Sequence, residues 1–382
     1  MSKTYLSHNN IFSNLGFGSA VVIDAIAKGK SGLEKHTDLA LLPQPFCASL
    51  IASEEIGKAF SNFADAQKYT KLEQMMILSL QNVIEAAQIP LNGMVGLIVS
   101  TTKGNIDVFE KESNFPESRA YLGELGKTVQ HFFGFKNEPI VLSNACVSGV
   151  LAISVAKRFI AEGKYDHVFI TSGDLVTPFI LSGFHSFQAL SEDPCRPYDK
   201  DRTGINLGEV AASALVTSSE ENLADEAVEI LGDATCNDAN HISGPSRTGE
   251  GLFRSVKAAL KEAQLDASQI DYIAAHGTAT SFNDEMEAIA FNRLGMEQVP
   301  LNSLKGYFGH TLGASGLLET IVGMHAVRKN LLFSSKGFSD LGVSKKLHII
   351  KQNSPKDLRV FLKTASGFGG CNTAVILKKI NI

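Results

Sequence analysis

The sequence predicts an α/β protein in which sheets are covered by layers of helices. Short apolar runs of strand length alternate with longer segments of helical period, which is typical of β-α-β units. Of the 382 residues, 44% are hydrophobic and only 20% are charged, so the chain can bury a large core and even a subunit interface. The 33 glycines against 11 prolines favour many tight strand-to-helix turns over extended linkers.

In the first half, three apolar strands and one helix define the pattern. Residues 94–100, 139–143 and 167–172 are apolar runs of strand length. Residues 147–161 have apolar side chains at every third or fourth position, which predicts a helix between the second and third strands.

The second half repeats this alternation. The predicted helices are 252–262, 284–294 and 314–328, and the predicted strands are 270–275, 299–303, 358–364 and 372–379. A glycine-rich turn at 366–370 joins the last two strands. The acidic stretch 220–229 is either a junction between two units, 1–220 and 221–382, or a solvated helix face.

Charge and cysteine usage exclude several classes of protein. A net charge of −5 argues against nucleic-acid binding, and no apolar run is long enough for a membrane-spanning helix. The first ten residues are polar and do not resemble a signal peptide. The five cysteines lack metal-site or redox spacing, so we expect reduced thiols in the cytoplasm.

Cys146 is the candidate nucleophile. It lies between a predicted strand and a predicted helix, where free backbone N–H groups and the helix dipole stabilise a thiolate and lower the cysteine pKa. A buried core cysteine at a tight turn is the alternative interpretation.

His276 ends a predicted strand in the segment HGTAT. A side chain at the carboxyl end of such a strand points into the cleft where α/β proteins bind ligands. Thr278 and Thr280 alternate along the following extended segment, so both hydroxyls are expected to face one groove. The alternative is a histidine that only caps the backbone.

His310 lies among three glycines, in a turn that a helix follows at once. The glycines allow a close approach of the backbone at this turn. Glu319, further along the helix, is placed to reach back to Lys305. The alternatives are an exposed lysine and a solvated glutamate.

Together these residues form a coherent set for acyl transfer. The Cys146 thiolate would take the acyl group, and the backbone N–H groups of Cys146 and Phe368 would hold the oxyanion. The two histidines would polarise the carbonyl of a second substrate. A metal site competes poorly, because His276 and His310 are 34 positions apart without a short-range ligand partner.

At this point the sequence resembles the β-ketoacyl-acyl-carrier-protein synthases of the condensing-enzyme (thiolase) superfamily. The resemblance covers the chain from about residue 12 to its end, with the motifs in family order. They are NACVSG at 144–149, RPYD at 196–199 with Arg202, Gly204 and Glu209, DANH at 238–241, HGTAT at 276–280, Lys305 with GHTLGASG at 309–316, and GFGG at 367–370 with Asn372.

The resemblance implies a role for each matching residue. Cys146 resembles the acylated nucleophile, and His276 and His310 resemble the pair that supports malonyl decarboxylation. Lys305 resembles the lysine that orients the site, and Glu319 resembles its ion-pair partner. Asp284 resembles a second carboxyl behind the site, and Phe368 resembles a gating aromatic whose N–H completes the oxyanion hole. Thr278 and Thr280 resemble the residues whose hydroxyls bind the phosphopantetheine arm.

The family also implies a fold and a reaction. We expect a thiolase-like five-layer α-β-α-β-α fold of two similar halves with mixed sheets, the nucleophile in 1–220 and both histidines in 221–382. The implied reaction is a decarboxylative Claisen condensation of an acyl thioester with malonyl-acyl carrier protein, in fatty-acid or type II polyketide or polyene biosynthesis. No metal or cofactor would be bound, because the pantetheine belongs to the carrier protein.

The implied partners are the acyl carrier protein and a second subunit, in a homodimer or in a heterodimer with another ketosynthase-like chain. An acidic carrier predicts a basic docking surface, for which Lys68, Lys71, Lys127 and Lys136 are available. Departures from the family pattern at Tyr198, Thr203, Ser366 and 99–105 are expected to affect the substrate and not the reaction.

Two alternatives share the fold. A coenzyme A-dependent thiolase would need a different motif at His276 and a second catalytic cysteine, and the GGCN context of Cys371 disfavours it. A non-catalytic partner subunit of the chain-length-factor type would have lost the nucleophile, whereas Cys146, His276 and His310 are all present.

Overall fold

The computed structural model describes residues 3–38, 40–111, 113–238 and 240–381, so Ala239 of the 238–241 motif lies outside the described residues. The first half contains β1 (Tyr5–Ser13), β2 (Gly16–Phe17), α1 (Ser19–Ala27), β3 (Glu34–His36), β4 (Phe46–Ser49), α2 (Ser53–Phe60), α3 (Lys71–Ala87), β5 (Val95–Ser100), α4 (Leu122–Phe133), β6 (Ile140–Leu142), α5 (Ser148–Ala161), β7 (His167–Asp174), α6 (Pro178–Ser186), β8 (Leu207–Gly208) and β9 (Val210–Thr217).

The second half repeats the alternation of strands and helices. It contains β10 (Val228–Asn237), α7 (Glu250–Ala263), β11 (Tyr272–Ala274), α8 (Ser281–Arg293), β12 (Pro300–Asn302), α9 (Lys305–Phe308), α10 (Ser315–Lys329), β13 (Leu331–Leu332), β14 (His348–Ile349), β15 (Ser354–Pro355), β16 (Val360–Gly367) and β17 (Cys371–Lys379).

The two halves share one strand arrangement. In the first, the order β6-β5-β7-β9-β1 has parallel pairs on either side of β5 and antiparallel pairs on either side of β9. In the second, the order β12-β11-β16-β17-β10 repeats the same directions around β11 and β17. A short β1–β10 pairing, through Tyr5 with Glu229 and Leu6 with Val228, joins both into one sheet path. The expectation of two similar halves with mixed sheets is confirmed.

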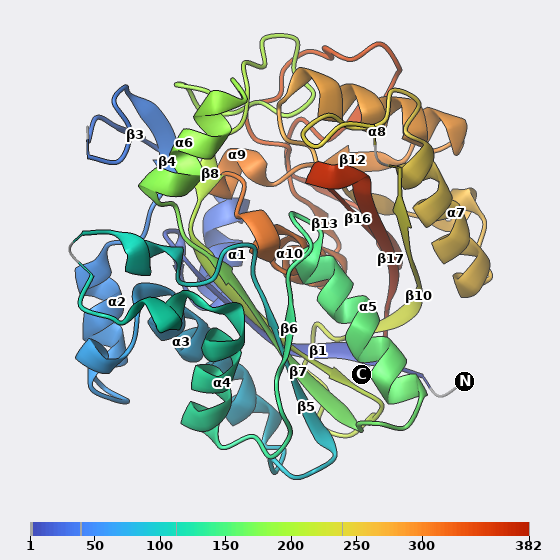
Figure 1. Cartoon of the computed structure of the whole chain (residues 1–382). Helices are drawn as coiled ribbons and strands as arrows, with labels where there is room; N and C mark the ends of the chain where they lie inside the picture. Colours follow the sequence, from blue (N-terminus) through green and yellow to red (C-terminus); the bar gives the residue numbers. More distant parts are fainter. Residues whose placement is uncertain (1–2, 39, 112, 239, 382) are drawn as a thin grey trace.

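Three apolar cores separate the layers. One lies between the first sheet and α3 and α4, and includes Leu72 and Met76. Another lies between the second sheet and α7 and α8, and includes Leu252 and Phe291. The largest surrounds α5 and α10, which run between the two sheets (Figure 1). The predicted five-layer α-β-α-β-α order is therefore confirmed.

The predicted elements match the observed ones to within a few residues at their ends, because their apolar patterns are long and unambiguous.

The structure excludes one of the two interpretations of the acidic stretch 220–229. It is a loop up to residue 227 and then the start of β10, and not a solvated helix face. The division into units 1–220 and 221–382 stays a prediction.

Within the described residues, no helix has the length and apolar content that crossing a bilayer requires.

The central helices α5 and α10 touch through glycine. A Cβ atom on Gly149 of α5 would lie 2.7 Å from the backbone nitrogen of Leu317, and a Cβ on Gly316 would lie 2.7 Å from that of Val150. Both distances are shorter than any ordinary van der Waals contact, so only glycine allows the two helix N-termini to approach this closely.

We expect Gly149→Ala to lower the free energy of unfolding by roughly 1–3 kcal/mol, because the added methyl group overpacks this contact. Gly57→Ala is the matched control, since Gly57 is also within a helix but nothing lies within 4 Å of the position that an added Cβ would take. That change should leave stability equal or raise it by about 0.5–1 kcal/mol. Urea denaturation measures both, and equal midpoints for the two variants would contradict the role of Gly149.

Candidate active site

Cys146 lies at a sharp corner between β6 and α5. Ala145 has a φ of +44°, a left-handed conformation that is uncommon for a residue with a side chain. Ser148 holds this corner, because its Oγ accepts from the Asn144 N–H at 2.8 Å and donates to the Ala145 carbonyl at 2.6 Å. The corner places Cys146 just before the first turn of α5, with only 8% of its surface exposed.

Both histidines follow strands of the second sheet. His276 comes two residues after β11, and its N–H and that of Gly277 donate to Glu287 on α8 at 2.9 and 2.7 Å. His310 follows β12 and α9 and precedes α10. The Cys146 Sγ and one ring nitrogen from each histidine all lie within 4.8 Å of one another, and the two rings meet edge to face with centroids 5.1 Å apart. The predicted convergence of these three side chains is observed.

The tautomer of His310 follows from its backbone neighbours. The Leu312 N–H donates to His310 Nδ1 at 3.1 Å, so Nδ1 must be the unprotonated nitrogen. Ser315 Oγ lies 2.8 Å from the same atom. The proton of the neutral ring is therefore on Nε2, which is buried without a hydrogen-bond partner among the described residues, as is Nδ1 of His276. Buried polar atoms of this kind are rare in native proteins and are available to a substrate.

Both imidazoles are neutral at physiological pH. Burial is the main cause that lowers the pKa of His276 and of His310 well below the ordinary value of 6.5. The positive charges of Lys305 and Lys363 act in the same direction. A histidine carries its proton charge only below its pKa, so at pH 7 the rings act as N–H donors and lone-pair acceptors.

The thiol of Cys146 differs from the sequence-based expectation of a lowered pKa. Burial is the largest effect and raises the pKa of Cys146 to about 12, and the neighbouring Cys371 acts in the same direction. Lys305 and the backbone N–H of Phe368 lower it but do not compensate. The sequence reasoning counted the helix N-terminus and missed the desolvation. The resting nucleophile is therefore a neutral thiol that needs a base.

A buried ion cluster lies behind His276. Lys305 Nζ contacts Glu319 Oε1 at 2.5 Å and donates to the His276 carbonyl at 3.0 Å, so the predicted Lys305–Glu319 pair is present and fully enclosed. Lys363 of β16 binds the other oxygen of Glu319. The sequence analysis missed Lys363, although a lysine inside the apolar strand 358–364 is itself a signal for a buried partner.

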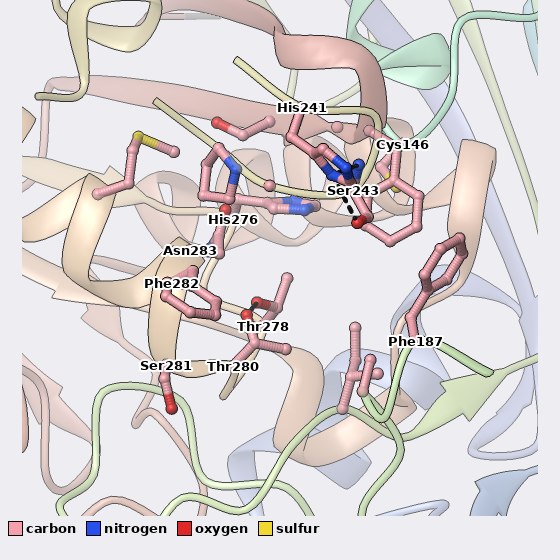
Figure 2. Close-up of a pocket in the computed structure, with 18 of the residues that line it drawn as sticks. Cys146, Phe187, His241, Ser243, His276, Thr278, Thr280, Ser281, Phe282 and Asn283 are labelled. Carbon is pink, nitrogen blue, oxygen red and sulfur yellow. Dashed lines mark hydrogen bonds between the residues drawn. The ribbon is translucent and has the colours of Figure 1, made fainter. Parts of the chain in front are cut away.

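A pocket of about 500 Å³ opens over the three reactive side chains. Thr278 and Thr280 line it, with their hydroxyl oxygens 2.8 Å apart, as Figure 2 shows below His276. Phe368 also lines it, and its backbone N–H interacts with the Cys146 thiol. The ring of Phe368 packs against Phe184 and Phe187, with centroids 5.7 and 5.4 Å away. The sequence analysis missed these two aromatic residues, because their spacing alone resembles ordinary helix packing.

Asp284 lies behind the pocket, as expected. It is fully buried and accepts hydrogen bonds from the backbone N–H groups of Tyr198 and Thr278 at 2.7 and 2.9 Å. Burial raises the pKa of Asp284 to about 6 and that of Glu287 to about 7. Glu287 was not singled out from the sequence, although the spacing Asp284-x-x-Glu287 places both carboxyls on one helix face.

One expectation about other ligands changes, and the basic docking surface for the carrier protein stays a prediction. A sulfur and two imidazoles at this spacing are close enough to share a metal ion, so the distance along the chain does not by itself disfavour a metal site. The described pocket lining also contains none of Lys68, Lys71, Lys127 and Lys136. Lys71 instead binds Glu209 at 2.7 Å. The cationic side chains that line the pocket are Arg202 and Arg247.

Comparisons with known proteins identify relatives of the whole arrangement. The family "Beta-ketoacyl synthase, N-terminal domain" matches residues 62–222, and "Beta-ketoacyl synthase, C-terminal domain" matches 227–338. The 3-oxoacyl-[acyl-carrier-protein] synthase 2 of Rhizobium meliloti is 34% identical over 66% of this chain and 63% of its own length. A putative polyketide beta-ketoacyl synthase 1 of Streptomyces halstedii is 31% identical over 74% of this chain and 70% of its own length.

A solved structure has the same fold. The ketosynthase of Xenorhabdus doucetiae, in complex with its chain length factor, superposes with a TM-score of 0.86 at 23% identity, over 99% of this chain and 98% of that chain.

We expect alkylation of Cys146 by iodoacetamide to be slow at pH 7 and to rise about tenfold per pH unit up to pH 10, because the thiolate is the reactive form and the pKa is about 12. Peptide mapping by mass spectrometry measures the rate, and the partly exposed Cys236 reports on reagent delivery. A rate at Cys146 that levels off below pH 8 would show a stabilised thiolate instead.

Proposed function

Because the chain belongs to the beta-ketoacyl synthase family, we propose that it catalyses the decarboxylative Claisen condensation of an acyl thioester with a malonyl thioester on acyl carrier protein. One observation supports this most strongly. The thiol of Cys146 and the imidazoles of His276 and His310 converge within 4.8 Å at the base of one pocket. A non-catalytic partner role is disfavoured, since it would not need this convergence.

The first step is acylation of Cys146. His310 cannot accept the thiol proton, because the Leu312 N–H occupies its only lone pair. His276, whose Nδ1 has no partner among the described residues, accepts it. The sulfur then forms a bond to the acyl carbonyl carbon, the bond to the carrier sulfur breaks, and the proton passes to the departing carrier thiolate.

The second step is condensation. The bond between the malonyl methylene carbon and its carboxylate breaks, carbon dioxide leaves, and the electron pair enters an enolate. The Nε2–H of His310 donates to the enolate oxygen in a buried site, where such a hydrogen bond is strongest. The enolate carbon attacks the acyl group on Cys146. The backbone N–H groups of Cys146 and Phe368 hold the resulting oxyanion until the Cys146 thiolate leaves. A proton from solvent then restores the thiol, because the original proton left with the carrier thiol in the first step.

The remaining pocket residues suit the carrier's arm. Thr278 and Thr280 present adjacent hydroxyl groups to the amides of a phosphopantetheine chain. Phe368, packed on Phe184 and Phe187, controls entry to the thiol. The reaction as written has no redox change and uses neither a metal nor a bound cofactor.

For the substrate and the assembly, we propose a class of pathway and a type of dimer. One relative is named a 3-oxoacyl-[acyl-carrier-protein] synthase and another a putative polyketide beta-ketoacyl synthase. We propose fatty-acid or polyketide synthesis as the setting, with acyl carrier protein as the partner. We propose a dimer, formed either by two copies of this chain or with a second ketosynthase-like subunit, as in the complex of the Xenorhabdus ketosynthase with its chain length factor. The five free cysteines, four of them buried, fit a reducing cytoplasm.

We expect the purified protein, incubated with acyl and malonyl carrier proteins, to gain an acyl adduct on Cys146 and to release one carbon dioxide per β-ketoacyl product. Intact-protein mass spectrometry and trapped labelled carbon dioxide measure the two outcomes. Cys146→Ala should lose the adduct and the product. A wild-type protein that stays unmodified with a competent donor would favour the non-catalytic partner role.

We expect His310→Ala to retain Cys146 acylation while condensation falls about 10²–10³-fold, because only the second step uses its Nε2–H donor. His276→Ala should slow acylation, since it removes the proton acceptor for the thiol, and it should slow overall turnover because condensation requires the acyl-enzyme. Single-turnover acylation and steady-state condensation separate the two effects. Near-normal condensation in His310→Ala would refute its assigned role.

A further inference from the structure

We propose that Lys363 is a positioning residue for the condensation step: acting through Glu319, it gives the buried cluster behind His276 a net positive charge that favours the developing enolate. This inference rests on the proposed function, because it concerns the same site. Lys363 does not line the pocket and is not placed to touch the substrate.

The geometry ties Lys363 directly to the backbone that carries His276. Its Nζ binds Glu319 and also lies 3.3 Å from the Ala275 carbonyl oxygen. Lys305 binds the other Glu319 oxygen and the next carbonyl, that of His276. Two ammonium groups bridged by one carboxylate thus hold two consecutive carbonyls at the end of β11. This arrangement holds the backbone that carries the His276 side chain.

With both lysines protonated, the cluster of Lys305, Glu319 and Lys363 carries one net positive charge. Lys305 and Lys363 have 0% of their side chains exposed, and Glu319 has 4%. One ammonium would suffice to pair the carboxylate, and burying a second positive charge costs stability. We infer that this cost is tolerated because the second charge contributes to the reaction. The neighbouring carboxyl of Glu287 is already engaged by the N–H groups of His276 and Gly277.

The excess positive charge acts on both histidines. Lys363 on β16 and Lys305 on α9 lower the pKa of His276 and His310. The opposing carboxylates are Glu319 on α10, with Glu287 and Asp284 on α8, and the latter two have a raised pKa and thus bind protons more readily than usual. Burial lowers the pKa of Lys363 itself, although Glu319 opposes this effect. The cluster therefore keeps the rings neutral and stabilises negative charge that forms beside them.

The test compares Lys363→Met, Lys363→Gln and Lys363→Arg. Methionine removes the charge and the hydrogen bonds, glutamine keeps a donor without charge, and arginine keeps the charge. We expect kcat for condensation to fall about tenfold or more in the first two variants, with little change in KM and without loss of Cys146 acylation, because a higher pKa makes His276 a better acceptor of the thiol proton. Their melting temperatures should stay equal or rise, because the remaining Lys305–Glu319 pair is neutral.

The pH dependence separates this role from a purely structural one. Removing the Lys363 charge raises the pKa of the histidines toward 6.5. Since they work as neutral rings, the acid limb of the kcat profile should move up by about one pH unit in the Met and Gln variants and return toward wild type in Lys363→Arg. The proposal would be overturned if stability and kcat fall together in the Met and Gln variants while the acid limb of the kcat profile stays at its wild-type position in both.

A second readout does not depend on activity. The ¹⁵N chemical shifts of labelled His276 and His310, followed with pH, should show higher histidine pKa values in Lys363→Gln than in wild type. Unchanged titration would contradict the inference even if the protein condenses substrates. A wild-type protein that releases no carbon dioxide but shows the predicted histidine shift would instead overturn only the proposed function.

Discussion

The contact between the N-terminal turns of α5 and α10 determines where the reactive groups lie. Cys146 lies two residues before α5 and His310 five residues before α10, so the approach allowed by Gly149 and Gly316 brings sulfur and imidazole to one place. Asp174, at the end of β7, reinforces the contact because it accepts from the Gly313 N–H at 2.8 Å and from the Thr101 hydroxyl at 2.9 Å. A carboxylate of the first half thus holds the glycine turn of the second.

Burial determines the protonation state of this site more than any single neighbour. It raises the pKa of the thiol and lowers the pKa of both imidazoles, so all three reactive groups are uncharged at rest. Behind these groups, Lys305, Glu319 and Lys363 form a buried charged cluster in which ionic partners replace the lost water. Uncharged reactive groups next to a charged cluster suit a reaction in which negative charge forms only transiently.

Much of this arrangement could be predicted from the sequence, because strong local signals coincide with chemistry. The apolar periods define β5, α5, β7 and α10, and the glycine-rich turns place Cys146 and His310 at helix starts. Quantities that depend on three-dimensional packing could not be predicted. The raised pKa of Cys146 reflects desolvation by residues far away in the chain, and the aromatic contacts of Phe184 and Phe187 depend on how α6 turns toward Phe368.

Lys363 was missed from the sequence for a different reason. Its position in an apolar strand was visible, but its partner Glu319 comes from a helix 44 positions earlier, and only the fold reveals the pair. Residue motifs identify groups that contact substrate. They do not identify a side chain that acts through another side chain.

The shared middle layer also bears on how the protein is made. The apolar face of α5 packs on α10, so a nascent chain released only as far as β9 would expose Val150 and Ile153 to water. Domains usually fold in order of synthesis, from the N-terminus onward. Here the first half must wait for the second, which makes the interval before α10 leaves the ribosome the period of greatest exposure to aggregation and to chaperones.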